Sequence, residues 1–179
     1  MSTVFTICET FKSGESSVAT RVCHLLDRLE LAIPFTTRRR RNAEDDGFVF
    51  TSQEAFNLMI AREEFLEYVQ VFGNYYGTPR HCLQEARERG NDLLIRVDER
   101  GAAQVKQKVS DAISILVLQP QSREDERSTD TASELLSRLS GAARMVDPGM
   151  FDHVLSGESY EENASRSAAI IRSERSLES

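Results

Sequence analysis

The segment from Glu9 to Ser17, with the sequence ETFKSGESS, has the outline of a loop that binds phosphate. It lies between an apolar run typical of a buried strand and a run whose apolar residues recur at helical spacing. Such a loop needs glycines that free its backbone amides, a lysine for the phosphates and a hydroxyl for Mg²⁺. Gly14 and Ser16 fit this scheme, but Glu15 stands where the lysine is needed.

Four consecutive arginines at positions 38–41 form a second candidate anion site. Guanidinium groups suit phosphate because they donate paired hydrogen bonds in a fixed geometry. The simpler interpretation is a solvated loop, since charged residues usually lie at the surface. Both interpretations stay open at this stage.

Composition limits the possible classes of protein. The 179 residues suffice for one domain with a sizeable core, and no apolar run is long enough to span a bilayer. The net charge of −7 argues weakly against a nucleic-acid partner, which requires a basic surface. The N-terminus has no secretory signal, and the three cysteines fit neither a disulfide framework nor a zinc site. We therefore expect a cytoplasmic protein with reduced thiols, no metal, no nucleic-acid partner and no membrane association.

Hydrophobic patterns predict strands and helices in alternation. Strands are expected at 3–8, 32–36, 65–72, 92–97, 113–118 and 153–155. Helices are expected from 16 to about 29, and at 51–61, 79–89, 102–108, 130–145 and 160–175. A capping box at 51–54 begins the second helix, and a turn is expected at 73–77. This order predicts an α/β fold in which helices cover a parallel sheet that carries a small β-rich insertion.

Two motifs carry a resemblance to a known family. TTRRRR at 36–41 and EFLEYVQVFGNYYGTPR at 64–80 resemble TTR-x-x-R and EFLEWAEVFGNYYGTPR of the guanylate kinases. Further segments extend the similarity over nearly the whole chain: VDERGAAQVK, AISILVLQP and STDTASELLSRLSGAA. The resemblance implies a P-loop-type parallel sheet covered by helices, with a small β-rich GMP-binding lobe and a shortened lid.

The same resemblance divides the chain into parts. It implies a single domain over residues 1–179, with a core at 1–36 and 79–179. The GMP-binding lobe is expected at about 37–78 and the shortened lid at about 121–131.

For the phosphate of GMP, the resemblance implies three ligands. Arg38 and Arg41 fall on the two phosphate-binding arginines of the family, and Tyr76 falls on a tyrosine whose hydroxyl joins them. Phe48 falls on a second phosphate-binding tyrosine, in a segment shortened by two residues, so one hydroxyl is missing.

For the guanine base, the resemblance implies two carboxylates and a hydroxyl. Glu67 matches the carboxylate that accepts hydrogen bonds from guanine N1 and N2, and Asp98 matches a second carboxylate near the amino group. Thr78 matches a hydroxyl that reaches the base, whereas Pro34 replaces a serine that usually contacts it. We expect GMP binding that is weakened but retained.

On the ATP side, the family pattern G-P-S-G-A-G-K-S-T is largely lost. Glu9 and Lys12 replace two glycines, Glu15 replaces the lysine, and Arg96 replaces the first aspartate of a D-I-D motif. Because an anion and a cation have exchanged places, we predict an ion pair between Glu15 and Arg96 across an empty ATP site.

The lid and the adenine side also depart from the family. Arg127 and Arg138 align with two arginines that contact the transferred phosphoryl group, but about six residues near position 122 are absent. The family motif N-D-D is replaced by Gly-Glu-Ser at 157–159.

These observations favour a catalytically defective module that binds GMP, another guanine nucleotide, or a phosphorylated or acidic protein segment, with no cofactor and no catalytic residue expected. The alternative is an active guanylate kinase that makes GDP from Mg-ATP and GMP, with Lys12 in place of the missing lysine. A structural domain without a ligand is the third possibility.

Overall fold

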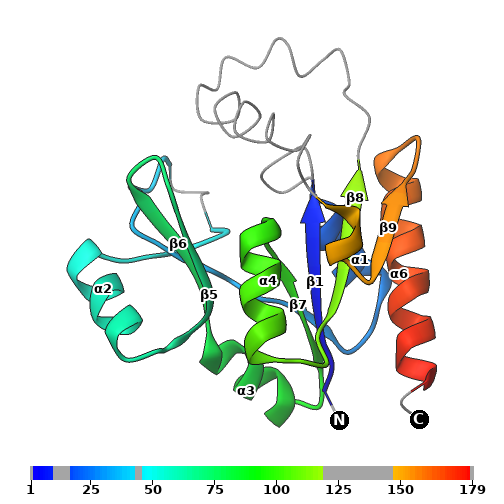
Figure 1. Cartoon of the computed structure of the whole chain (residues 1–179), viewed down its shortest axis with the longest axis horizontal. Coiled ribbons are helices and arrows are strands. Elements are labelled where there is room, and N and C mark those ends of the chain that lie inside the picture. The colour runs from blue at the N-terminus through cyan, green and yellow to red at the C-terminus, as the bar shows by residue number, and fades with distance from the viewer. Residues whose placement is uncertain (1, 10–16, 43–45, 119–146, 178–179) are drawn as a thin grey trace.

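The computed structural model describes residues 2–9, 17–42, 46–118 and 147–177. Within these ranges a five-stranded sheet forms the core, and a separate four-stranded sheet lies beside it as a lobe (Figure 1). The expected α/β fold, a parallel sheet with helices and a small mixed sheet, is confirmed.

All five strands of the core sheet run parallel. Their order is β2 (Leu29–Leu31), β7 (Asp92–Arg96), β1 (Val4–Glu9), β8 (Ile113–Leu118) and β9 (His153–Ser156). The central strands are almost wholly buried and rich in apolar residues, as expected for a sheet with helices on both faces.

Among the described residues, two pairs of helices cover the faces of this sheet. On one face, α1 (Val18–Leu25) and α6 (Tyr160–Leu177) pack against Phe5 and Ile7. On the other, α3 (Arg80–Glu88) and α4 (Glu99–Lys108) pack around Val4. Side chains of β1 alternate between the two faces because successive residues of a strand point in opposite directions.

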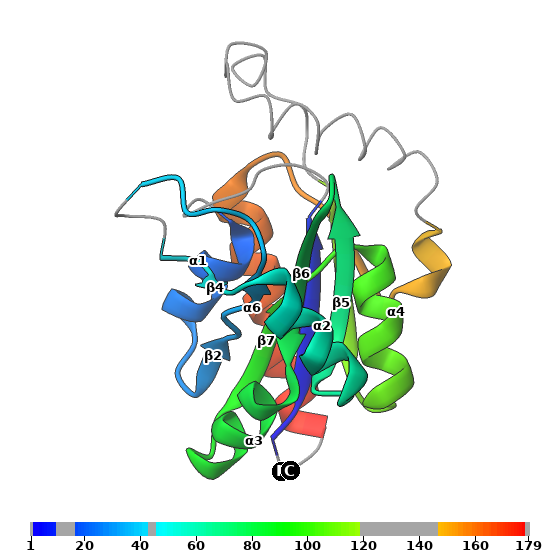
Figure 2. The same ribbon diagram turned by 90° about the vertical axis from the view of Figure 1, so that its left-hand side faces the viewer.

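The described part of the lobe contains one helix and four strands. They are β3 (Phe35–Thr36), β4 (Val49–Phe50), α2 (Gln53–Ala61), β5 (Phe65–Val71) and β6 (Asn74–Pro79), and the sheet order is β4-β3-β6-β5. Phe56 of α2 stacks on Phe65 and Tyr75, with ring centroids 4.4 and 5.3 Å apart, and so closes the small core of the lobe. Figure 2 shows the molecule from the side of this lobe.

A two-residue turn joins β5 to β6. Phe72 and Gly73 both have positive φ, at 48° and 78°, as a tight hairpin with primed turn geometry requires. The predicted turn at 73–77 is therefore wrong beyond Gly73, because the residues after it pair with β5 as part of β6.

Three other expectations need correction. The predicted strand at 32–36 is confirmed only at its end, as β3; the preceding strand, β2, ends at Leu31 and belongs to the other sheet. Leu29 begins β2 and does not extend α1, which ends at Leu25 because Leu26 has extended backbone angles; Arg28, with a positive φ of 56°, lies in the turn that leads into β2. The second helix is capped by Ser52, one residue after the start of the predicted capping box. Its Oγ accepts a hydrogen bond from Ala55 N at 3.1 Å.

The remaining predicted elements are confirmed within a few residues at their ends, except the helix at 130–145. That segment lies outside the described residues. The predicted lid at 121–131 and residues 10–16 of the candidate phosphate loop also lie outside them. No helix in the described ranges is long and apolar enough to cross a membrane.

Candidate functional site

Glu67 is the most deeply buried carboxylate of the candidate GMP site. It lies on β5 with 5% of its surface exposed, opposite Thr78 on β6. Its Oε1 accepts hydrogen bonds from Thr78 N at 2.8 Å and from Thr78 Oγ1 at 2.7 Å. Burial raises the pKa of Glu67 to about 7, although the two bonds from Thr78 act in the opposite direction.

Asp98 brings a second negative charge to the same place from the core. It caps α4, where its Oδ1 accepts from Gly101 N at 2.8 Å, and its other oxygen pairs with Arg100 at 2.7 Å. Its charge adds to the rise in the pKa of Glu67. A Cβ on Gly101 would lie 3.0 Å from Glu67 Oε2, so the absence of a side chain there lets the buried carboxylate pack against α4.

The structure thus brings together three of the sequence-predicted base ligands, from three elements. A buried carboxylate, a hydroxyl and a half-exposed carboxylate at one position can accept several hydrogen bonds from a base that carries adjacent N–H donors. Pro34 provides no donor, and its carbonyl oxygen accepts from Val49 N at 2.9 Å, which joins β3 to β4.

Two of the three predicted phosphate ligands, Arg38 and Tyr76, lie at an aromatic cluster in the lobe. The Arg38 guanidinium carbon lies 5.2 Å from the centre of the Phe48 ring and 5.3 Å from that of Phe50. Phe48 in turn contacts Tyr76 edge-on, with ring centres 5.8 Å apart. Phe48 therefore sits beside Arg38 and Tyr76, and its ring carries no hydroxyl there.

The rest of the arginine run is more exposed. Arg40 stacks over Phe50 at 4.8 Å and pairs with Asp46 at 3.3 Å. Arg41 is exposed at the end of the described part of this loop. The backbone before the run is fixed by Thr36, whose Oγ1 accepts from Arg38 N at 3.1 Å and donates to Tyr75 O at 2.9 Å.

On the ATP side, most predicted residues lie outside the described ranges. Gly14, Glu15, Ser16, Lys12, Arg127 and Arg138 are among them, so the Glu15–Arg96 ion pair stays a prediction. Arg96 is described at the end of β7, where burial lowers its pKa and the charge of Glu9 opposes that shift.

Glu9 has a role that the sequence did not indicate. Its carboxylate accepts from Val18 N at 3.0 Å and from Ala19 N at 3.1 Å, at the start of α1. Burial raises the pKa of Glu9, while these two bonds and the charge of Arg96 lower it. In the sequence, Glu9 was interpreted only as a replacement for a glycine of the family pattern. A carboxylate that precedes a predicted helix can stabilise the helix N-terminus, and this was the feature that could have indicated its role.

The segment 157–159 connects β9 to α6 and caps that helix. Gly157 N donates to Asn163 Oδ1 at 2.8 Å, and a Cβ at Gly157 would lie only 2.5 Å from that oxygen. Glu158 N donates to Glu162 Oε2 at 2.9 Å. Tyr160 reaches across to α1, where its hydroxyl donates to Ser17 O at 2.9 Å.

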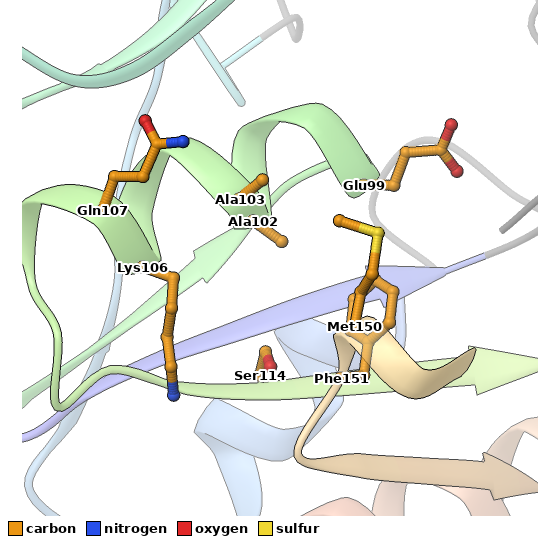
Figure 3. A pocket seen from close by; sticks show the side chains of 8 residues that line it. All are labelled: Glu99, Ala102, Ala103, Lys106, Gln107, Ser114, Met150 and Phe151. Atoms are coloured by element: carbon orange, nitrogen blue, oxygen red, sulfur yellow. The ribbon is translucent and has the colours of Figure 1, made fainter. Parts of the chain in front are cut away.

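A cavity of about 270 Å³ lies apart from these residues, between α4, β8 and the short helix η3 (Pro148–Met150) (Figure 3). Ala102, Met150 and Phe151 provide its apolar wall. Lys106 lies at its edge and pairs with Asp152 at 3.1 Å, and that carboxylate also accepts from Ser114 Oγ at 2.8 Å. These bonds fasten α4 to β8, and none of the sequence-predicted ligands lines the cavity. No group of metal-ligating side chains occurs within the described ranges.

The family model for guanylate kinase matches residues 12–174. The guanylate kinase of Koribacter versatilis is 37% identical over 184 residues, which cover 97% of this chain and 79% of the relative. The guanylate kinase of Thermotoga maritima is 32% identical over 180 residues, covering 96% and 87%. The crystal structure of guanylate kinase from Anaplasma phagocytophilum superposes with a TM-score of 0.73 at 25% identity, covering 97% of this chain and 86% of that one.

The fold defines an α/β protein in which helices cover a parallel five-stranded sheet, with a small mixed sheet beside it. This chain belongs to the guanylate kinase family.

Proposed function

We propose that this protein binds GMP through the lobe and is impaired in phosphoryl transfer from ATP. The observation that carries the first half is the convergence of Glu67, Thr78 and Asp98 from β5, β6 and α4. Family membership supports it, since the relatives are named for a reaction of guanine nucleotides.

The chemistry of these ligands selects guanine. A carboxylate that accepts from N1–H and the N2 amino group discriminates against adenine, which lacks that pair of donors. At the other end of GMP, the phosphate would be bound by Arg38, Arg41 and Tyr76. Each hydrogen bond lost with the missing hydroxyl at Phe48 and the serine replaced by Pro34 should cost about 0.5–1.5 kcal/mol, so we expect GMP affinity reduced by up to tens-fold.

The sequence of the ATP side supports the second half of the proposal. Glu15 in place of lysine exchanges an attraction for a repulsion toward the phosphates. One pair of unit charges at 4 Å is worth about 4 kcal/mol at an effective dielectric of 20, so this change alone is comparable with the binding energy of a micromolar nucleotide, about 8 kcal/mol. No cofactor is needed for the proposed function.

The second candidate function is guanylate kinase activity with Mg-ATP, in which Lys12 replaces the missing lysine. The relatives favour it, because all those compared above are named guanylate kinases. A coupled assay for ADP formation from ATP, GMP and Mg²⁺ separates the two. Turnover within about a hundredfold of typical kinase rates of 1–100 s⁻¹ would overturn the proposed impairment.

Calorimetry tests the proposed ligand directly. GMP should bind, AMP should bind at least tenfold more weakly, and ATP should show no heat of binding. Arg41→Ala should abolish GMP binding without a change in melting temperature, because an exposed guanidinium contributes little to the core. If GMP fails to bind while a phosphorylated peptide binds, the ligand class is a phosphorylated protein segment instead.

A further inference from the structure

The first amides of α1 are all bound by the chain itself. A helix begins with N–H groups that have no partner within the helix, and these need an acceptor. Val18 N and Ala19 N donate to the two oxygens of Glu9, and Thr20 N donates to Ser17 Oγ at 3.2 Å. Arg21 N begins the helical pattern with a bond to Ser17 O at 3.2 Å.

The acceptor Glu9 comes from the sheet and not from the helix. It is the last residue of β1, and its side chain lies on the same face as Ile7, toward α1. Arg96 is placed beside this end of β1 because β7 pairs with β1 in parallel, with Arg96 opposite Ile7. The start of α1, Glu9 and Arg96 therefore lie at the carboxyl ends of adjacent parallel strands, where the charges of Glu9 and Arg96 interact.

In proteins with this strand–loop–helix unit, that place is where a phosphate binds, because the amides and the helix dipole both favour an anion. Here the carboxylate of Glu9, which accepts two hydrogen bonds, already occupies this position. An incoming phosphate would have to displace Glu9 or share the position with a like charge, and close like charges repel strongly in a partly buried site.

We propose that Glu9 is a built-in anion that occupies the N-terminus of α1 and keeps polyphosphate ligands away from it. The contact is autoinhibitory: it stabilises the start of α1 without a nucleotide and makes nucleotide phosphates competitors of the protein's own side chain. It rests on the proposed function only for the identity of the excluded ligand, and it does not depend on GMP binding.

The experiment uses inorganic pyrophosphate as the probe, so that no base contact contributes. Glu9→Gly removes the competing carboxylate, and Glu9→Gln keeps its shape but removes the charge. We expect pyrophosphate to bind Glu9→Gly at least about tenfold more tightly than the wild type, with Glu9→Gln between them. Backbone amide shifts of Val18 and Ala19 should report the binding in a titration followed by NMR.

A second substitution locates the anion. Combining Glu9→Gly with Arg96→Met should abolish the gained pyrophosphate binding, since the guanidinium no longer faces the ligand. Arg21→Met, a matched control on the exposed side of α1 where Arg21 pairs with Glu161 at 3.0 Å, should leave it unchanged.

Thermal unfolding of each variant serves as the control for folding, and GMP binding is measured in parallel by calorimetry. If Glu9→Gly does not fold, the same comparison is made with Glu9→Gln. Equal pyrophosphate affinity of wild type and both variants would overturn the inference, as would amide shifts confined to regions away from α1. If GMP binds none of the proteins while pyrophosphate binding follows the expected order, the proposed function fails and the role of Glu9 stands.

Discussion

At the scale of single residues, the site depends on the environment of one carboxylate. Glu67 is buried and accepts two bonds from Thr78, yet its pKa is raised to about 7 because burial and the charge of Asp98 penalise its ionised form. The ionised form is purely an acceptor, whereas the protonated form presents an O–H donor that faces the donors of guanine unfavourably. Protonation of the free protein therefore competes with the ligand near neutral pH.

This competition predicts a pH dependence of guanosine binding. Guanosine is the better probe, because it lacks the phosphate of GMP, which itself titrates near neutral pH. Affinity should reach a plateau above about pH 7 and fall by up to tenfold per pH unit below it, as the raised pKa of Glu67 requires. Calorimetry from pH 5.5 to 8.5 measures it, with Glu67→Gln as the control that should bind weakly and without this dependence. A flat profile for the wild type would contradict the assignment.

A second prediction concerns the missing hydroxyl. Phe48→Tyr should place an O–H donor beside Arg38 and Tyr76, which lie around the Phe48 ring. A neutral hydrogen bond contributes about 0.5–1.5 kcal/mol, so GMP affinity should rise by roughly two- to tenfold. Guanosine affinity, measured in parallel, should stay unchanged. Equal gains for both ligands would place the new hydroxyl away from the phosphate.

At the scale of elements, α4 holds the lobe in position. The side-chain amide of Gln104 accepts from Tyr68 N at 3.1 Å and donates to Tyr68 O at 2.9 Å, much as a neighbouring strand would. Lys108 Nζ donates to Phe65 O at 3.0 Å on the same strand. Glu67 lies between these two anchored residues of β5, so its position depends on α4.

We therefore expect Gln104→Ala to affect both stability and binding. Loss of two hydrogen bonds to part-buried backbone groups should lower the free energy of unfolding by about 1–3 kcal/mol and weaken GMP binding, because Glu67 is less firmly placed. Gln107→Ala is a matched control on the same helix, since Gln107 is exposed. Denaturant unfolding and calorimetry measure the two effects. Identical behaviour of the two variants would show that the hydrogen bonds between Gln104 and Tyr68 do not position Glu67.

At the scale of the whole molecule, the Glu9 contact and a cluster around Asp92 lie at opposite ends of the core sheet. Glu9 and Arg96 lie at the carboxyl ends of β1 and β7, whereas both chain termini lie at the other end (Figure 1). There, Arg175 near the end of α6 pairs with Asp92 at 2.7 Å and donates to Asp27 O and Arg28 O. Asp92 also accepts from Thr3 N at 2.8 Å.

This cluster predicts a large stability effect far from the candidate site. Arg175→Met should lower the free energy of unfolding by about 3 kcal/mol, because it leaves the largely buried Asp92 carboxylate without its partner. Arg172→Met removes one exposed bond to Leu25 O, at 3.2 Å, and should cost less than about 1 kcal/mol. GMP affinity should be unaffected in both variants. A small effect of Arg175→Met would mean that Asp92 is adequately hydrated without the pair.

The sequence alone determined the family and the order of most elements. The motif at 64–80 could be read directly because it forms one hairpin, in which a two-residue turn fixes which residues of β5 and β6 face each other. Glu67 and Thr78 are therefore neighbours for local reasons. The apolar strands and amphipathic helices were likewise predictable, because their periodicity reflects local geometry.

Tertiary structure decided what depends on contacts between distant segments. The approach of Asp98 and Gly101 to Glu67 follows from the packing of α4 on β5, and no local pattern encodes it. The placement of β2 and β3 in different sheets depends on which strands lie alongside them, β7 for the first and β6 for the second. The bonds of Glu9 to Val18 and Ala19 arise because β1 ends against the start of α1, where the nearest strong acceptor satisfies the open amides.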